Sequence, residues 1–235
     1  MRRWLIPPKA SAAFVAAMED VLDVYARPVD PKRPVVCFDE AGKDLKAHTR
    51  PPQPAAPGRD ARQDSEYERE GNRNLFLSYA PHLGRRAIAV TERRTGVDFA
   101  YAIRDVVDGQ YPEAEAVVLV LDNLNTHRPA ALYEAFPPAE ARRLLDRIEW
   151  HYTPTHGSWL NMAELEWSVL SRQCLHRRIP DAATLEAEVA AWVAARNAEG
   201  ATAAWRFTKE DARQRLHWLY PLPQSDNIAV SQHSA

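Results

Sequence analysis

Two aspartates, Asp39 and Asp122, each follow directly after a short run of apolar residues. Residues 35–38 read VVCF and residues 117–121 read VVLVL. Continuous apolar runs of this length are typical of strands buried on both faces. Open α/β sheets carry their chemistry beyond the carboxyl ends of such strands, so both carboxylates are candidates for a functional site. The simpler alternative is that Asp122 only begins a turn, because Asp and Asn are good turn formers.

The elements around these acids follow one another in a mixed order. Apolar periodicity predicts helices at 11–26, 95–108, 129–136, 139–145, 160–175, 181–197 and 208–219, and strands at 33–40, 75–79, 86–91, 117–122 and 147–152. An antiparallel unit that leads into parallel strands with flanking helices describes a ribonuclease-H-like α/β fold. The pattern alone leaves other mixed α/β folds open.

The domain organisation that we expect has three parts. Residues 1–32 would form a helical connector, residues 33–220 the ribonuclease-H-like domain, and residues 221–235 a flexible tail. Residues 43–74 are polar and contain the proline-rich stretch PPQPAAPG, which predicts a long irregular loop.

Composition narrows the function classes. The chain has 235 residues, a formal net charge of −2 and 46% hydrophobic residues, so it can bury a substantial core. Apolar runs stay well below the roughly 20 residues that cross a bilayer, and the N-terminus lacks the apolar segment of a secretory signal. Cys37 and Cys174 are the only cysteines, which indicates a reducing cytoplasm without a disulfide framework.

A third stretch, residues 151–175, carries a specific resemblance. It reads HYTPTHGSWLNMAELEWSVLSRQCL and resembles the "YSP…LNPIE…W" block of mariner-superfamily DDE transposases, most closely the bacterial insertion-sequence branch. FDE at 38–40 and LDNLNTH at 121–127 are similar to the other two blocks of that family. The resemblance implies a ribonuclease-H-like catalytic domain whose catalytic, metal-binding trio is Asp39, Asp122 and Glu164.

The third acid has a competitor in Glu166. Residues two apart on a helix point about 200° apart, so only one of Glu164 and Glu166 can face the site. Helical geometry leaves this choice open, whereas the resemblance favours Glu164. We therefore expect Glu166 to be a solvent-facing or ion-pairing residue.

Three carboxylates gathered at one site repel one another unless cations bind between them. Mg²⁺ or Mn²⁺ fits such oxygen ligands, and two ions roughly 3.5–4 Å apart can support in-line displacement at phosphorus. The resemblance implies the reaction: water cuts double-stranded DNA at the transposon end, and the freed 3′-OH then attacks target DNA. It also implies a homo-oligomer on DNA, in a bacterial cytoplasm close to the nucleoid.

Polar residues near the acids are candidates for supporting roles. Asn123, Asn125 and His127 could orient the metal ligands, or could only bond to their own loop backbone. His156 could contact a DNA phosphate, could position Glu164, or could be a plain turn residue.

Local basic charge suggests where DNA would bind, although the net charge does not. Arg172, Arg177 and Arg178 are candidates for lining the DNA, because phosphate contacts depend on local charge. The alternative is that these arginines belong to ordinary solvated faces.

The chain also departs from the family. Full-length relatives carry a helix-turn-helix region before the first acid, and only 38 residues precede Asp39. We therefore expect a catalytic domain alone, a truncated copy or one product of a split reading frame. The alternative function is a non-catalytic fragment that binds DNA or a transposase and modulates a full-length partner.

Overall fold

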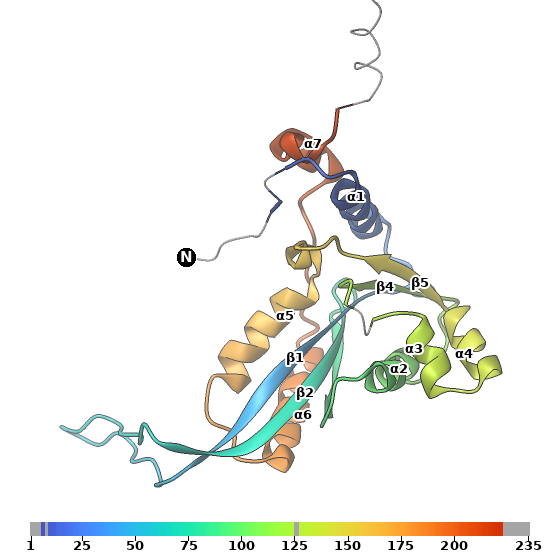
Figure 1. The fold of residues 1–235 in the computed structure, drawn as a ribbon. Coiled ribbons are helices and arrows are strands. Elements are labelled where there is room, and N and C mark those ends of the chain that lie inside the picture. Colours follow the sequence, from blue (N-terminus) through green and yellow to red (C-terminus); the bar gives the residue numbers. More distant parts are fainter. Residues whose placement is uncertain (1–5, 8, 125–126, 223–235) are drawn as a thin grey trace, which may run out of the picture.

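The computed structural model describes residues 6–7, 9–124 and 127–222. Within these residues a five-stranded sheet in the order β3-β2-β1-β4-β5 forms the centre of the molecule (Figure 1). The strands are β1 (Val35–His48), β2 (Tyr67–Ala80), β3 (Arg85–Thr91), β4 (Val117–Leu121) and β5 (Ile148–Tyr152). β1, β2 and β3 are antiparallel, whereas β4 pairs parallel to β1 and β5 pairs parallel to β4. This mixed sheet is the predicted ribonuclease-H-like arrangement.

The helices cover both faces of this sheet. They are α1 (Ala12–Ala26), α2 (Gly96–Arg104), α3 (Ala130–Ala135), α4 (Pro138–Leu145), α5 (Ala163–Leu170), α6 (Ala182–Ala198) and α7 (Lys209–Arg215). Ser11 and Asp181 cap α1 and α6, and Thr208 forms a capping box with Asp211 at α7, as their sequence positions predict. Among the described residues, no helix combines the length and apolar character that a bilayer crossing requires.

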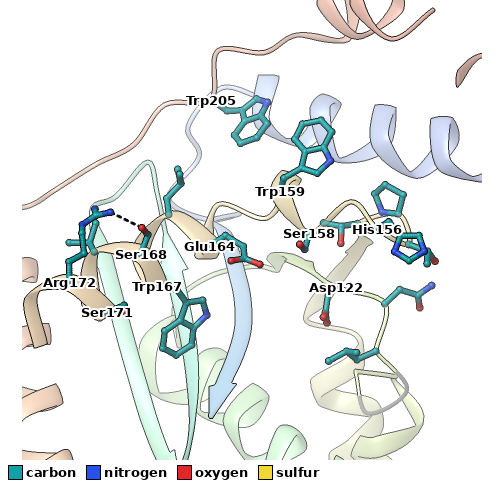
Figure 2. A pocket seen from close by; sticks show the side chains of 17 residues that line it. Asp122, His156, Ser158, Trp159, Glu164, Trp167, Ser168, Ser171, Arg172 and Trp205 are labelled. Carbon is teal, nitrogen blue, oxygen red and sulfur yellow. Dashed lines mark hydrogen bonds between the residues drawn. The ribbon is translucent and has the colours of Figure 1, made fainter. Parts of the chain in front are cut away.

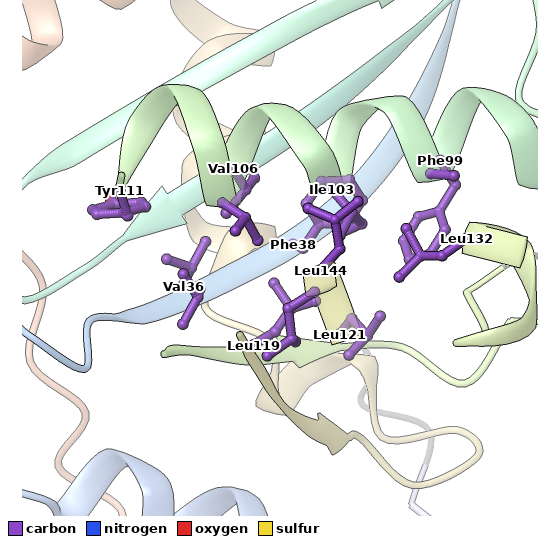
Figure 3. Packing of buried hydrophobic residues seen from close by; sticks show 14 of the residues in the cluster. Val36, Phe38, Phe99, Ile103, Val106, Tyr111, Leu119, Leu121, Leu132 and Leu144 are labelled. Atoms are coloured by element: carbon purple, nitrogen blue, oxygen red, sulfur yellow. The ribbon is translucent and has the colours of Figure 1, made fainter. Parts of the chain in front are cut away.

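Alternation along the buried strands divides the core between the two faces. Leu119 and Leu121 of β4 face α2, α3 and α4, and Figure 3 shows them packed with Val36, Phe38 and residues of those helices. Val120 faces the other way, toward α1, the start of α5, and α7. Because α1 packs directly on the sheet, the segment that we expected to be a connector contributes to the core.

The helix predicted at 160–175 is interrupted. A 3-10 turn at Ser158–Leu160 comes first, α5 begins at Ala163, and a π-helical turn at Ser171–Leu175 follows it. The helix predicted at 95–108 likewise continues as a π-helical turn, Asp105–Gln110, so Gly109 lies inside the turn and does not close the helix. In both segments the hydrogen bonding changes from α-helical to π-helical, and apolar periodicity does not reveal this change.

The prediction of an irregular loop over 43–74 is wrong for much of its length. β1 runs on to His48 and β2 begins at Tyr67, and the two strands form an antiparallel arm that projects from the sheet (Figure 1). Most of the outer part of β2 is exposed. The main-chain ladder therefore holds this arm without the apolar alternation by which a half-buried strand is recognised.

Candidate active site

Strand pairing brings the first two acids together. β1 and β4 are parallel, with Val35 opposite Val118 and Cys37 opposite Val120. Continued by two residues, this register brings Asp39 opposite Asp122, at the carboxyl end of β4. The two aspartates are 83 positions apart in the sequence, and yet the parallel pair makes them neighbours.

The N-terminal turn of a helix positions the third acid. Glu164 lies in the first turn of α5. The Asn161 side chain ties this turn to β1, because its amide donates to the Phe38 carbonyl at 2.9 Å and its oxygen accepts from the Ala163 amide at 3.1 Å. The buried hydroxyl of Tyr25 donates to the Leu160 carbonyl at 2.7 Å. These contacts fix the approach of α5 to the strand that carries Asp39.

The pKa of Asp39 responds to the charges of the other two acids. Burial, followed by the negative charges of Glu164 and Asp122, raises the pKa of Asp39 to about 7. A hydrogen bond from the Glu40 main-chain amide at 2.9 Å opposes this rise without cancelling it. Clustered carboxylates of this kind fit a hard divalent cation, since the cation would supply the missing positive charge. Asp39, Asp122 and Glu164 are therefore the residues that could hold Mg²⁺ or Mn²⁺.

His127 is fully buried and lies between two carboxylates. Its Nδ1 lies 2.5 Å from Asp122 Oδ1, and its Nε2 lies 2.6 Å from Glu40 Oε2. Burial by itself lowers the pKa of His127, but the hydrogen bonds to Asp122 and Glu40 outweigh it and raise the pKa to about 9. The ring stacks on Phe99 with centroids 4.8 Å apart. His127 thus links Asp122 to Glu40 and fixes the Asp122 carboxylate.

Glu40, Asp122 and His127 also lie close enough to be considered a metal cluster by themselves. We disfavour that interpretation on chemical grounds. Both ring nitrogens face carboxylate oxygens and therefore carry protons, and a protonated imidazole has no lone pair for a metal. His127 acts as the counter-charge of this pair of acids.

The turn between β5 and α5 shapes the mouth of the site. His156 adopts a left-handed backbone conformation with φ 65°, which is uncommon for a residue with a side chain. Gly157 has an ordinary negative φ, but a Cβ there would meet Pro154 Cγ at 2.5 Å. The turn therefore depends on close packing at Gly157, and His156 supplies the unusual backbone angle.

An open pocket of about 1170 Å³ lies in front of the acids. Figure 2 shows Asp122 and Glu164 entering it from different elements, with His156 at the side of Asp122. Asn123 also lines this pocket and is exposed, whereas Asn125 lies outside the described residues. Three indole rings also line the pocket: Trp159 and Trp205 lie together on one side of Glu164, and Trp167 lies on the other (Figure 2). Trp159 and Trp167 are half-buried, and each packs against the core as well as lining the pocket.

Glu166 points away from this pocket into an ion-pair cluster. Its Oε1 lies 2.9 Å from Arg86 Nε and 3.2 Å from Arg196 Nε, and the Arg86 side chain is fully buried. Glu166 is thus an ion-pairing residue, and Glu164 is the acid of α5 that faces the carboxylates. The cluster joins α5 to β3 and α6 and so holds the outer side of α5.

The three candidate DNA-binding arginines separate into two places. Arg172 lines the pocket of the acids and donates to Ser168 at 2.8 Å. Arg177 and Arg178 line a second, smaller pocket beside the arm.

Sequence reasoning missed Glu40, Asn161 and Tyr25 as supporting residues. Glu40 and Asn161 lie inside the stretches that carry the resemblance, so their neighbourhood was a usable signal. Tyr25 gave none, because its position in an amphipathic helix is that of an ordinary core residue.

Fold and site together define a ribonuclease-H-like domain with a cluster of acids at the end of its parallel strands. The sequence profile described as DDE superfamily endonuclease matches residues 34–186, more than half of the chain. The chain therefore belongs to the DDE superfamily endonucleases. A sequence comparison with curated proteins finds no match.

Solved structures of a mariner transposase share the fold. The mariner Mos1 paired-end complex with Mg matches with a TM-score of 0.59 and 15% identity, covering 94% of this chain and 67% of that chain. The Mos1 strand transfer complex matches at 0.55 and 14%, covering 93% and 62%. The Mos1 paired-end complex with the left transposon end matches at 0.53 and 14%, covering 86% and 61%. The chain thus spans less than two thirds of the length of the proteins in the last two structures.

Proposed function

We propose that this chain is the catalytic domain of a transposase, which cuts DNA at transposon ends and joins the freed 3′-OH to target DNA. The observations that carry the proposal are that Asp122 and Glu164 line one open pocket, and that burial and these two negative charges raise the pKa of Asp39 to about 7. Membership of the endonuclease family and the fold shared with Mos1 transposase support it.

The residues of the site would have different roles in this reaction. Asp39 and Asp122 are held rigidly by paired strands, and Asn161 sets the position of the helix that brings Glu164 to them. His127 pairs with Oδ1 of Asp122, and Asp122 lines the pocket in which a cation would bind. Divalent metal bound by the three acids would activate the attacking oxygen and stabilise the leaving oxygen of the phosphodiester.

Further parts of the proposal concern cofactor number, partners and location. Two Mg²⁺ or Mn²⁺ ions would occupy the site, one at the attacking oxygen and one at the leaving oxygen of the in-line displacement. Double-stranded DNA is the substrate, as in the Mos1 complexes with transposon ends. We propose that the protein acts as a homo-oligomer on that DNA in a bacterial cytoplasm.

The test is nicking of a labelled DNA duplex with Mg²⁺ or Mn²⁺ by the wild type, Asp122→Asn and Glu164→Gln. Both substitutions remove a charge and keep the side-chain shape, so we expect the fold to remain and nicking to disappear. Asp146→Asn, which changes an exposed aspartate of a surface ion pair, is the matched control and should nick at the wild-type rate.

Equal nicking by all variants would refute the assignment. Absence of nicking by the wild-type chain, together with retained DNA or transposase binding, would favour the non-catalytic fragment.

A further inference from the structure

A second pocket, of about 610 Å³, lies between the base of the β1–β2 arm and the residues that follow α5. We call it the basic pocket. Most of its charged side chains can carry positive charge: it is lined by Lys43, Lys46, His176, Arg177 and Arg178, with Asp44 as its acid.

Neutral groups hold two of these cations in place. Lys43 Nζ donates to the Leu175 carbonyl at 2.6 Å and to the Arg177 carbonyl at 3.1 Å. Arg178 donates to the carbonyls of residues 65 and 66 at 3.0 Å and 2.8 Å. Carbonyl oxygens orient a cation without neutralising its charge. The positive charge of both side chains therefore remains available to an anion.

The Tyr67 ring contacts two of the cations, Lys46 and Arg178. Lys46 Nζ lies 4.7 Å from the centroid of the Tyr67 ring, and the Arg178 guanidinium lies 5.4 Å from it. The acids nearby pair at the rim, where Asp44 lies 3.5 Å from Lys46 and Glu188 lies 2.5 Å from Arg177. These two acids do not match the number of cations.

Burial and a neighbouring cation both act on Lys43. Burial, followed by the positive charge of Lys46, lowers the pKa of Lys43. An anion bound in the pocket would relieve this repulsion, in the same way that a cation would relieve the repulsion among the acids.

The basic pocket is aligned with the acidic site. Lys43 lies four residues beyond Asp39 on the same strand, before the register shift of the arm, so both side chains belong to the same face of β1. Four residues of a strand span about 13 Å. For a duplex whose axis runs along β1, that length corresponds to roughly four phosphates of one strand, which follow one another every 3.4 Å of helix axis. α5, which carries Glu164, lies alongside β1 over this interval, and the segment after it carries Arg177 (Figure 1).

We propose that the basic pocket binds one backbone phosphate of the DNA strand held at the acidic site, roughly four nucleotides from the phosphodiester that is cut. The inference rests on the proposed function, because it takes the distance from Asp39 as a distance along bound DNA. The contact is to a phosphate and carries no base information, so it fixes the register of the strand without selecting its sequence.

The first test measures duplex binding by fluorescence anisotropy with Ca²⁺ and across a range of salt concentrations. The variant is the double substitution Lys43→Gln with Arg178→Gln, because carbonyl oxygens and not acids hold these two cations. Its Tm is measured beside its affinity, so that a loss of folding is distinguished from a loss of binding. We expect affinity to fall about 5- to 20-fold and the salt slope to shrink by about one phosphate contact. Arg142→Gln, which changes an exposed arginine of α4, is the matched control and should bind like the wild type.

The second test locates the phosphate. Single methylphosphonates, which remove the charge of one phosphate, are placed one at a time along the duplex. Fe²⁺ with ascorbate and peroxide marks the DNA nearest the acidic site by radical cleavage, which requires no hydrolysis by the protein. We expect one sensitive phosphate, three to five nucleotides from the mark, in the wild type and no added effect of that methylphosphonate in the double variant.

Each outcome separates the two proposals. A wild type that shows no sensitive phosphate in that window, or a double variant that keeps the full sensitivity, overturns the basic pocket even if metal-dependent nicking is normal. A third outcome is that millimolar inorganic phosphate inhibits duplex binding by the wild type while no methylphosphonate has an effect. This outcome would assign the pocket to free phosphate and would also overturn the inference. A wild type that fails to nick, but shows the sensitive phosphate, supports the pocket and refutes only the catalytic proposal.

Discussion

The side-chain amide of Asn161 donates to the main-chain carbonyl of Phe38 at 2.9 Å, and so joins the start of α5 to the residue before Asp39. The same side chain accepts from the Ala163 amide, and the Asn161 carbonyl accepts from the Glu164 amide at 3.1 Å. One buried residue therefore determines how far apart two of the three acids lie.

Asn161→Ala should impair metal binding more than it impairs folding. It leaves a buried carbonyl and a buried amide unpaired, at a cost of about 1–3 kcal/mol. We expect the Mn²⁺ concentration that gives half of the metal-induced rise in Tm to increase several-fold. Asn74→Ala removes a comparable amide donor, which bonds to the Glu92 carbonyl at 3.2 Å, and should lower Tm without changing the Mn²⁺ requirement. Equal Mn²⁺ requirements in the two variants would contradict the role of Asn161.

Glu164→Gln and Glu166→Gln should have opposite effects. Glu164 is exposed at the pocket, so its substitution should abolish nicking and leave Tm nearly unchanged. Glu166→Gln leaves the fully buried Arg86 without its carboxylate, which should cost about 3–5 kcal/mol of unfolding free energy. Nicking by this variant should persist well below its Tm. The measurements are thermal unfolding and nicking of both variants. Loss of nicking in Glu166→Gln and loss of stability in Glu164→Gln would instead make Glu166 the catalytic acid.

Asp39→Asn should stabilise the metal-free protein. The pKa of Asp39 is raised to about 7, so the folded state binds the extra proton more tightly than the unfolded state. The stability that the Asp39 carboxyl contributes is present below the unfolded pKa near 4 and is lost as pH rises through about 7. At pH 8 we expect the substitution to raise the free energy of unfolding by roughly 2–4 kcal/mol and to remove the Tm rise caused by Mg²⁺. Urea unfolding with EDTA, repeated at pH 5 as a control where the gain should shrink, tests this expectation.

Glu149 should contribute stability that is lost in acid. Burial alone would raise its pKa, but hydrogen bonds from Arg27, His151 and Arg33 outweigh burial and lower the pKa to about 2. The ionised carboxylate therefore stabilises the fold above the unfolded pKa near 4.5, and this contribution disappears as pH falls toward 2. Because the site is partly exposed, we expect Glu149→Gln to cost only about 1 kcal/mol at pH 7.

The measurement is urea unfolding of Glu149→Gln and the wild type at pH 7, 4 and 3. The difference between the two proteins should shrink at each step toward acid. A difference that stays constant over this range would show that the Glu149 carboxylate has no lowered pKa.

The strand ends were the part of the site that local sequence could predict. The apolar runs before Asp39 and Asp122 demand burial on both faces, and such strands meet at one edge of a parallel pair. Helical geometry could not show which of Glu164 and Glu166 faces the site, because Glu166 is held by Arg86, which lies on a strand distant in sequence. The family resemblance supplied that choice.

The links behind the acids could not be predicted, since they cross the fold. His127 reaches Glu40 only because β1 and β4 are adjacent, and no spacing in the sequence encodes that contact. The arm was missed for another reason. Its strands are held by main-chain hydrogen bonds, and the polar, exposed residues of the outer part of β2 resemble those of a loop.

Cys37 gives this strand a natural chemical reporter. It lies two residues before Asp39, is fully buried beside the Tyr25 hydroxyl, and has a pKa raised to about 12 by burial. Thiol reagents attack the thiolate, so the folded strand should resist alkylation and react only when β1 separates from its neighbours. The rate at which a thiol reagent alkylates Cys37 would therefore report how often the strand that carries Asp39 opens, without any engineered label.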